Sequence, residues 1–176
     1  TRGRNVSVIF GDGAGAVVMQ ATEEEGKGVL STHLYSEGKY AEELALIGPN
    51  TGHWVPEIME SEEEDISYYP VMNGNFVFKN AVIRFQEVIN EALQTNGKTA
   101  NEIDLLIPHQ ANLRISQYIQ QKMGLSNDQV FNNIMKYGNT TAASIPIAMS
   151  EAWAEGKIKD GDTICLAAFG SGFTWG

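Results

Sequence analysis

Helical and extended hydrophobic patterns alternate along the second part of the chain. Between 80 and 95, apolar side chains recur every three or four residues, which is typical of a helix with one buried stripe, and Asn96-Gly97 is a suitable stop. Strands that alternate with helices of this length indicate an α/β fold, a parallel or mixed sheet covered by helices. The predicted helices are 80–95, 112–123 and 141–155, and the predicted strands are 103–107, 130–134 and 163–168, followed by a turn at 169–176.

The first part of the chain carries weaker patterns. Short β-branched runs predict strands at 6–10, 14–20 and 29–35, and a tight glycine-rich turn joins the first two. Glycine and proline then interrupt every pattern from 36 to 67. We interpret the acidic run at 60–65 as a solvated surface loop.

Length and composition restrict the class of protein. The chain has 176 residues, the size of one domain or of one large half of a two-part enzyme. With 43% hydrophobic and 19% charged residues, it has the composition of a folded protein and not of a disordered one. It begins with Thr1 instead of Met and has no signal-peptide pattern, so we interpret it as a fragment or a processed product.

Charge, cysteine and histidine content argue against several functions. A formal net charge of −10 disfavours nucleic acid and anionic membrane surfaces as partners, and no long apolar run predicts a transmembrane helix. The single cysteine, Cys165, cannot form an internal disulfide, which fits a reducing compartment, and its place in a predicted strand favours an inert buried thiol. His33, His53 and His109 are far apart in the sequence and lack partners at ligand spacing, so no metal is expected.

The segment 11–16 (GDGAGA) matches the dinucleotide-binding fingerprint with alanine in the last place. That fingerprint holds a pyrophosphate only where a helix begins directly after it, and residues 17–20 favour β structure instead. We therefore interpret the segment as a structural hairpin whose small residues permit close backbone approach.

Two polar residues lie where a predicted strand gives way to a helix. Side chains at the carboxyl ends of parallel strands face the crevice where ligands bind. By position alone, His109 is either a catalytic or a hydrogen-bonded structural histidine. Asn139 either caps the following helix or directs its amide at a developing oxyanion.

A third candidate, Ser171, lies between Gly170 and Gly172 after the last predicted strand. Backbone N–H groups in such a segment fit an oxyanion hole as well as a simple turn. The segment is not the G-x-S-x-G nucleophile elbow, because the glycines directly flank the serine and no helix follows.

Together these motifs resemble the β-ketoacyl-acyl-carrier-protein synthase III family of fatty-acid synthesis, within the thiolase-like superfamily. Chalcone synthases and hydroxymethylglutaryl-CoA synthases share the general plan but resemble the motifs less. The motifs cover essentially the whole chain: GDGAGAVV (Gly11–Val18), NGNFVFKNAV (Asn73–Val82), PHQANLRI (Pro108–Ile115), GNTTAASIPIA (Gly138–Ala148) and AFGSGFTWG (Ala168–Gly176).

The resemblance implies a catalytic Cys–His–Asn set, of which this chain has His109 and Asn139. The family's Cys belongs to a segment that this chain lacks, and Cys165 stands in a different motif. The implied reaction transfers an acyl group from acyl-CoA to the Cys and condenses it with malonyl-acyl-carrier-protein, with loss of CO2. A neutral His109 and the amide of Asn139 would stabilise the enolate, and the backbone N–H of Ser171, glycine in many relatives, would complete an oxyanion hole.

The resemblance also implies binding residues, partners and an incomplete thiolase-like fold. Residues 1–70 correspond to the tail of the N-terminal half with its connecting loop, and 71–176 to the C-terminal half. The parent is expected to be a cytoplasmic homodimer that binds acyl carrier protein and uses acyl-CoA as substrate, without a further cofactor. The implied residues are Asn75, Asn112 and Phe169 for the substrate and CoA, and Lys79, Arg114 and Lys122 for carrier-protein docking.

Two alternatives stay open at this point. A related thiolase-fold condensing enzyme of secondary metabolism would keep the fold and change the acyl substrate. A non-catalytic domain retained for dimerisation or carrier docking would explain the absence of the Cys motif, although the intact motifs around His109 and Asn139 argue against decay.

Overall fold

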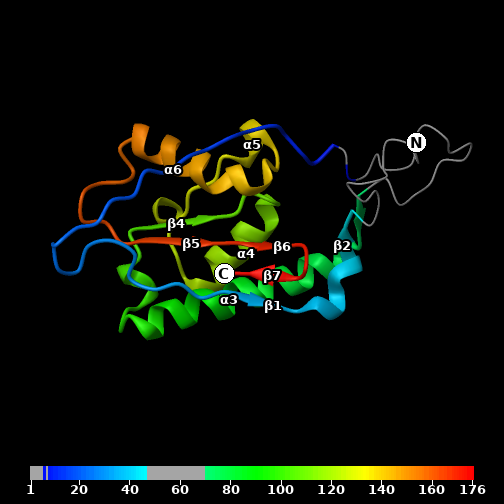
Figure 1. Ribbon diagram of the computed structural model, residues 1–176, viewed down its shortest axis with the longest axis horizontal. Coiled ribbons are helices and arrows are strands. Elements are labelled where there is room, and N and C mark those ends of the chain that lie inside the picture. The colour runs from blue at the N-terminus through cyan, green and yellow to red at the C-terminus, as the bar shows by residue number, and fades with distance from the viewer. Residues whose placement is uncertain (1–5, 7, 47–69) are drawn as a thin grey trace, which may run out of the picture.

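The computed structural model describes residues 6, 8–46 and 70–176 of the chain (Figure 1). None of the described helices is long and apolar enough to cross a membrane. The α-helices are α3 (Gly74–Thr95), α4 (Leu113–Met123), α5 (Ile134–Tyr137) and α6 (Ser144–Ala154), and the 3-10 turns are η1 (Gly38–Glu43), η3 (Ala100–Glu102), η4 (Asn127–Gln129) and η5 (Thr141–Ala143). The strands are β1 (Tyr35–Ser36), β2 (Leu44–Ala45), β3 (Val71–Met72), β4 (Leu105–Pro108), β5 (Ile164–Ala167), β6 (Phe169–Gly170) and β7 (Thr174–Trp175).

The parallel pair of β4 and β5 forms the centre of the fold, with Leu106 opposite Cys165. Successive side chains of a strand point to opposite faces, and the two faces of β4 enter different clusters. Leu106 packs with residues of α3 and α4, whereas Leu105 and Ile107 pack with Ala148 of α6. Figure 1 shows α3 and α6 on opposite sides of the pair. The strand is therefore buried on both faces, as a parallel strand covered by helices should be.

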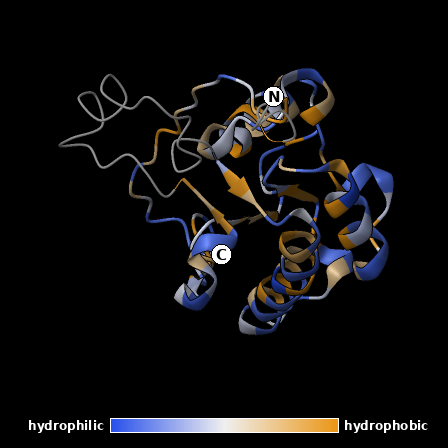
Figure 2. Cartoon of the chain, turned by 90° about the vertical axis from the view of Figure 1, so that its right-hand side faces the viewer, coloured by the Kyte–Doolittle hydropathy of each residue, from blue (hydrophilic) through white to orange (hydrophobic). Residues whose placement is uncertain are grey.

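The longest of the described helices, α3, confirms the apolar stripe expected between 80 and 95. Its buried residues are spaced three or four apart, so one face enters the core. Figure 2 shows hydrophobic residues concentrated in the central strands and on the inward sides of the helices. The helix begins at Gly74, six residues before the predicted start, because Phe76 packs its ring edge-on against Tyr40 at 4.9 Å. This tertiary contact stabilises a helical turn in an aromatic stretch with weak helix propensity.

The other predicted helices are also present. Asn112 caps α4 by accepting the backbone N–H of Arg114 at 2.9 Å, and Gly124 ends the helix in the left-handed conformation with φ 69°. The stretch predicted at 141–155 divides into η5 and α6, with Pro146 in the first turn of α6, where proline is tolerated.

The C-terminal residues form a hairpin where the sequence predicted only a turn. Strands β6 and β7 pair antiparallel, and β1 pairs with the other edge of β7, which places Tyr35 opposite Trp175. Their rings stack with centroids 5.7 Å apart, and the Arg84 guanidinium of α3 lies 4.5 Å from the Trp175 ring. Phe173, between the two strands, is fully buried and joins the hairpin to the core.

The predicted strands near the N-terminus are wrong. Residues 14–20 are extended but unpaired, 29–35 contributes only Tyr35 to a strand, and 6–10 contributes one bridge, between Phe10 and Asn139. Val18 is 96% exposed, so this β-branched segment lacks the neighbouring strand that would turn extended backbone into a sheet.

The strand predicted at 130–134 is also wrong, because it reduces to a bridge between Val130 and Leu106. Its last residue, Ile134, instead begins the short helix α5. The acidic run at 60–65 and His53 lie outside the described residues.

Two isoleucines on α3 test the assignment of its buried face. Ile89 is 1% exposed and Ile83 is 52% exposed. We expect Ile89→Ala to lower the free energy of unfolding by about 2–5 kcal/mol, because it leaves a cavity in the core. The matched control Ile83→Ala should change it by less than about 0.5 kcal/mol. Urea denaturation followed by circular dichroism measures both, and equal losses would contradict the assignment.

Candidate active site

His109 directly follows β4, at the carboxyl end of the parallel pair. Its backbone N–H donates to the carbonyl of Ala167 at 2.7 Å, so the residue continues the β4–β5 ladder by one step. This fixes the backbone of the histidine at the edge of the sheet where ligands of open α/β folds bind. The location expected from the sequence is confirmed.

The imidazole of His109 contacts a buried hydroxyl. Its Nδ1 lies 2.6 Å from Oγ of Ser144, the first residue of α6, which is only 2% exposed. Burial lowers the pKa of His109 below its ordinary value of 6.5, since the charged form loses hydration. The ring is therefore neutral near pH 7, with one nitrogen held by the protein and the other available to a ligand.

Asn139 is held by an extended segment from the N-terminal part of the chain. Its backbone N–H donates to the carbonyl of Ile9 at 2.9 Å, and its carbonyl accepts the N–H of Gly11 at 3.0 Å. The side-chain Oδ1 accepts the backbone N–H of Thr141 at 2.8 Å, which closes an Asx turn. Since this bond occupies the amide oxygen, the Nδ2 donors of the carboxamide are the groups left to a ligand.

Thr141 adopts an unusual conformation in that turn. Its φ of 52° lies in the left-handed region, which is uncommon for a β-branched residue. The hydrogen bond to Asn139 stabilises this strained backbone, and strain of this kind is typical of functional sites. Asn139 thus stabilises the turn before α6 and also keeps two donors free, so neither of the two roles left open by the sequence excludes the other.

The GDGAGA segment packs its backbone against the loop that carries Asn139. A Cβ on Gly11 would lie 2.0 Å from the carbonyl oxygen of Tyr137, and one on Gly15 would lie 2.6 Å from Cγ of Pro146. The expected close approach is therefore confirmed, whereas the expected hairpin is wrong because residues 14–20 pair with no strand. No α-helix follows the segment within 8–46, so it lacks the helix N-terminus that a pyrophosphate needs.

Gln110 joins the His109 end of β4 to the segment before Asn139. Its amide nitrogen donates to the carbonyls of Pro108 and Phe131 at 2.7 and 3.3 Å. Its amide oxygen accepts the backbone N–H groups of Asn133 and Ile134 at 3.0 and 3.2 Å. The side chain is 3% exposed and uses its full hydrogen-bonding capacity, so it fixes the two segments relative to each other.

Glu151 of α6 holds the short helix α5 in place. Its carboxylate accepts hydrogen bonds from Tyr137 Oη at 2.5 Å and Asn133 Nδ2 at 2.8 Å, and it lies 3.3 Å from Lys136 Nζ. The Tyr137 hydroxyl is the main cause of the lowered pKa of Glu151, followed by the Asn133 amide. The loop between α5 and η5, which presents Asn139, is therefore anchored on both sides.

Sequence reasoning missed Gln110, Ser144 and Glu151. Gln110 stands inside the PHQAN motif, where a polar residue directly after an apolar strand was a usable signal. Ser144 and Glu151 contact partners 35 and 14 residues away, and no local pattern reports such contacts.

The remaining catalytic and substrate candidates differ in exposure: one is buried in the core and the others lie on the surface. Ser171 is exposed in the turn between β6 and β7, where its carbonyl accepts from Thr174 Oγ1 at 2.8 Å. Phe169 is 6% exposed and lies in the hydrophobic core, with its ring 4.9 Å from that of Phe173. Asn75 is exposed in the first turn of α3, and the Oδ1 of Asn112 serves as the α4 cap.

The three basic candidates are all exposed on neighbouring helices. Lys79 lies on α3, while Arg114 and Lys122 lie on α4, which packs against α3. Lys122 Nζ lies 5.5 Å from the Tyr118 ring, and none of the three pairs with a described acidic side chain. As far as the described residues are concerned, no carboxylate occupies their ammonium and guanidinium groups.

Two features of the described part of the chain concern cysteine nucleophiles and metal binding. Burial raises the pKa of the Cys165 thiol to about 11, so the thiol is protonated at neutral pH, as expected of an inert cysteine. Within 6, 8–46 and 70–176, no group of three His, Cys, Asp or Glu side chains is placed to hold a metal ion.

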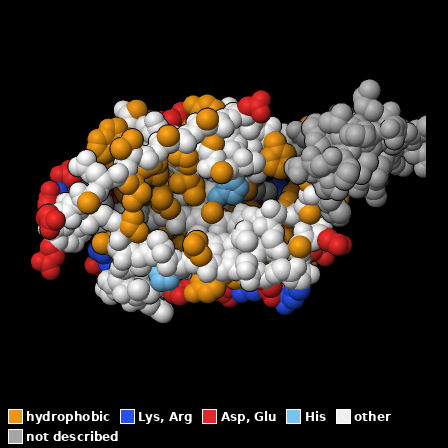
Figure 3. All heavy atoms as spheres, viewed as in Figure 1, with side chains coloured by type: hydrophobic (Ala, Val, Ile, Leu, Met, Phe, Trp, Pro, Cys, Tyr) orange, Lys and Arg blue, Asp and Glu red, His pale blue; other side chains and the backbone are white. Residues whose placement is uncertain are grey.

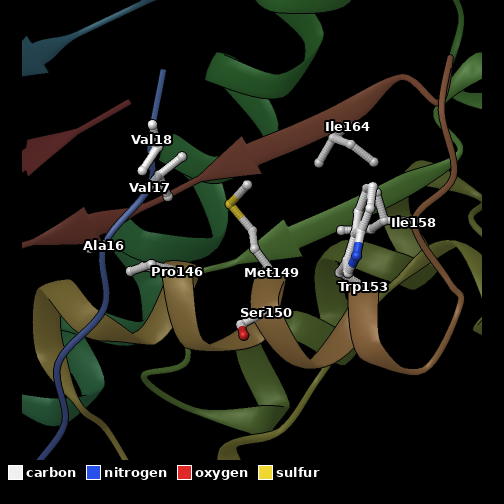
Figure 4. A pocket seen from close by; sticks show the side chains of 9 residues that line it. All are labelled: Ala16, Val17, Val18, Pro146, Met149, Ser150, Trp153, Ile158 and Ile164. Atoms are coloured by element: carbon white, nitrogen blue, oxygen red, sulfur yellow. The ribbon is translucent and has the colours of Figure 1, made fainter. Parts of the chain in front are cut away.

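An apolar hollow of about 420 Å³ lies between the extended segment at 16–18 and α6. Figure 4 shows Met149 and Trp153 of α6 and Ile164 of β5 around it. Hydrophobic side chains gather on this face of the molecule in Figure 3. Neither His109 nor Asn139 lines the hollow, so it is separate from the candidate active site.

Comparison with solved structures defines the class of protein. The fold superposes on 3-oxoacyl-[acyl-carrier-protein] synthase III from Aquifex aeolicus VF5 with a TM-score of 0.83 and 42% identity, covering 98% of this chain and 50% of that one. The enzyme from Pseudomonas aeruginosa PAO1 gives 0.82 and 34% over the same shares. The fold is therefore that of the thiolase-like condensing enzymes.

The sequence comparisons define the family within that class. The C-terminal model of 3-oxoacyl-[acyl-carrier-protein] synthase III matches residues 93–176, and a second model of the same family matches 1–38. The β-ketoacyl-[acyl-carrier-protein] synthases III of Salmonella arizonae and Desulfotalea psychrophila are 46% and 45% identical over 173 residues, 98% of this chain. The chain belongs to the 3-oxoacyl-[acyl-carrier-protein] synthase III family, and it spans about half the length of these relatives, 51% and 52%.

The lowered pKa of His109 predicts a pH dependence of stability. Below 6.5 the unfolded chain binds a proton on this histidine before the folded chain does, so the free energy of unfolding should fall as the pH drops. Above 6.5 the imidazole is neutral in both states, and this contribution should be constant. An NMR titration should give His109 a midpoint below pH 6.5, and the loss of its signals in His109→Gln would identify them. A midpoint above 6.5 would contradict a pKa lowered by burial.

Proposed function

We propose that this chain carries the His–Asn part of a 3-oxoacyl-acyl-carrier-protein synthase III that starts fatty-acid chains. In the proposed reaction an acyl group passes from acyl-CoA to a Cys thiolate, and malonyl-acyl-carrier-protein then loses CO2. The resulting enolate attacks the acyl-Cys to give 3-oxoacyl-acyl-carrier-protein and the free thiol. The observation that carries the proposal is the position of His109, fixed at the end of β4 with one ring nitrogen bonded to Ser144.

Two neutral donors suit the decarboxylation step. Loss of CO2 leaves negative charge on the malonyl thioester oxygen, and the free N–H of His109 and Nδ2 of Asn139 would both donate to it. A neutral imidazole stabilises the enolate without protonating it, and the lowered pKa of His109 supports that state. Removal of one such donor costs about 3–4 kcal/mol of activation free energy, or roughly 10²–10³ in rate.

The nucleophile in this proposal comes from outside the 176 residues. The only cysteine of the chain, Cys165, has a thiol pKa raised to about 11 by burial and is a poor nucleophile near neutral pH. This chain alone should therefore have no condensing activity. The backbone N–H of Ser171, in an exposed turn, would complete the oxyanion hole for the acyl-Cys.

Substrate and partner contacts complete the proposal. The exposed Asn75 and the free amide nitrogen of Asn112 would hold the pantetheine arm, and Phe169, packed in the hydrophobic core, would contribute to the substrate site. Lys79, Arg114 and Lys122 would bind the acidic carrier protein. Acyl-CoA acts as substrate, and no metal or further cofactor takes part. The parent would be a cytoplasmic homodimer.

The comparisons favour this function over a condensing enzyme of secondary metabolism. The priming β-ketosynthase of the R1128 polyketide pathway is 26% identical with a TM-score of 0.67, below the 42% and 0.83 of the Aquifex aeolicus enzyme. A purely non-catalytic domain would not need the side-chain hydrogen bonds that hold His109 and Asn139.

His109→Ala tests the proposal in the natural polypeptide that contains this sequence. With a short acyl-CoA and malonyl-acyl-carrier-protein, CO2 release should fall roughly 10²–10³-fold, because one enolate donor is lost. Acyl transfer to the Cys should be less affected. The matched control is His33→Ala, whose ring lies 3.2 Å from Glu91 and does not contact the site. Unchanged CO2 release in His109→Ala would refute its role, and a wild type without condensation would refute the function.

Arg114→Glu tests the docking role of α4. The exposed guanidinium is expected to contact the acidic carrier protein, so reversal of its charge should weaken carrier-protein binding about tenfold and leave CoA binding unchanged. Lys157→Glu makes the same change of charge at an exposed residue after α6 and should have little effect. Calorimetric titration with carrier protein and with CoA separates the outcomes, and equal loss of both in Arg114→Glu would contradict the docking role.

A further inference from the structure

Among the described residues, the hydroxyl of Ser144 has two hydrogen-bond partners, and both belong to the histidine segment. Oγ lies 2.6 Å from Nδ1 of His109 and accepts the backbone N–H of Gln110 at 3.3 Å. The serine is 2% exposed, so water is not a ready substitute for either partner. Its hydrogen bonds therefore have to be satisfied by these groups.

Proton counting decides the direction of the short bond. If Nδ1 of His109 donated to Ser144, Oγ would accept two hydrogen bonds, and its own buried hydroxyl hydrogen would have no acceptor among the described residues. An unsatisfied buried donor costs about 1–3 kcal/mol. If Ser144 donates to Nδ1 instead, every group is satisfied, since Oγ still accepts the N–H of Gln110. The second arrangement is favoured.

We infer that Ser144 is a positioning residue that fixes the neutral tautomer of His109, with the proton on Nε2. A hydroxyl that donates to Nδ1 leaves that nitrogen unprotonated, so Nε2 carries the only imidazole proton. The same bond fixes the rotation of the ring, because Ser144 belongs to the first turn of α6 and cannot move independently. Ser144 thereby determines that His109 presents a donor, and not a base, to whatever binds at the end of β4.

This inference rests on the proposed function only for its consequence in catalysis. An enolate oxygen needs a donor, and an imidazole with its proton on Nδ1 would offer it a lone pair instead. Ser144 also begins the helix that follows the Asn139 turn, five residues along the chain. One side chain therefore couples the orientation of His109 to the loop that presents Asn139.

The ¹⁵N NMR spectrum of the imidazole tests the tautomer directly and needs no substrate. At a pH above the ordinary histidine pKa, we expect the wild-type His109 signals to show a proton on Nε2 and a hydrogen-bonded, unprotonated Nδ1. In Ser144→Ala the Nδ1 signal should shift as its donor is lost, and the two tautomers should exchange. Ser150→Ala, a matched change on the exposed side of α6, should leave the spectrum unchanged. A wild-type proton on Nδ1 would overturn the inference.

Kinetics of the natural polypeptide test the consequence. We expect Ser144→Ala to lower kcat for CO2 release roughly tenfold with little change in KM, because the substrate still binds but meets a misoriented donor. Ser144→Thr keeps the hydroxyl and should restore both the single tautomer and most of the rate. An unchanged kcat in a folded Ser144→Ala protein would overturn the inference, and if both variants unfold, the wild-type spectrum decides alone. The Nε2 tautomer in a protein without condensing activity would refute the proposed function and leave the inference intact.

Discussion

The parallel pairing of β4 with β5 is the constraint on which the site depends. Helices cover both faces of β4, so its side chains divide between two hydrophobic clusters and the strand cannot shift by one residue without exposing them. The pairing ends where His109 donates its backbone N–H to Ala167, which gives the histidine a fixed position at the rim of a rigid core. The position of His109 is therefore determined by the burial of the hydrophobic side chains of β4.

Polar side chains fix the loop that carries Asn139 relative to the end of β4. Gln110 bonds to both the strand end and the segment before α5, and Glu151 holds α5 from the opposite side. The buried amide of Gln110 is fully paired, which is the condition for a buried polar group to specify one arrangement instead of destabilising the core. His109 and Asn139 keep their free nitrogens because their other polar atoms are already bonded within this network.

Local sequence information was sufficient for some of these features and insufficient for others. The helices and the place of His109 were predictable, because apolar spacing and strand ends are encoded in neighbouring residues. The strands expected at 14–20 and 29–35 failed because β-branched residues favour extended backbone, while pairing depends on a partner that no local pattern reveals. Ser144 was missed for a similar reason, since a serine at a helix start already has an ordinary explanation and its true contact lies 35 residues away.

The contact between Gly11 and Tyr137 has a consequence for how substitutions act in this protein. Any side chain at position 11 would collide with the main chain that leads into Asn139, although the core of the fold lies elsewhere. Amino-acid changes there should displace the segment that holds Asn139 more than they disturb the hydrophobic core. A genetic screen that scores only folded, abundant protein would overlook this glycine, whereas a screen that reports the position of the Asn139 loop would recover it as indispensable.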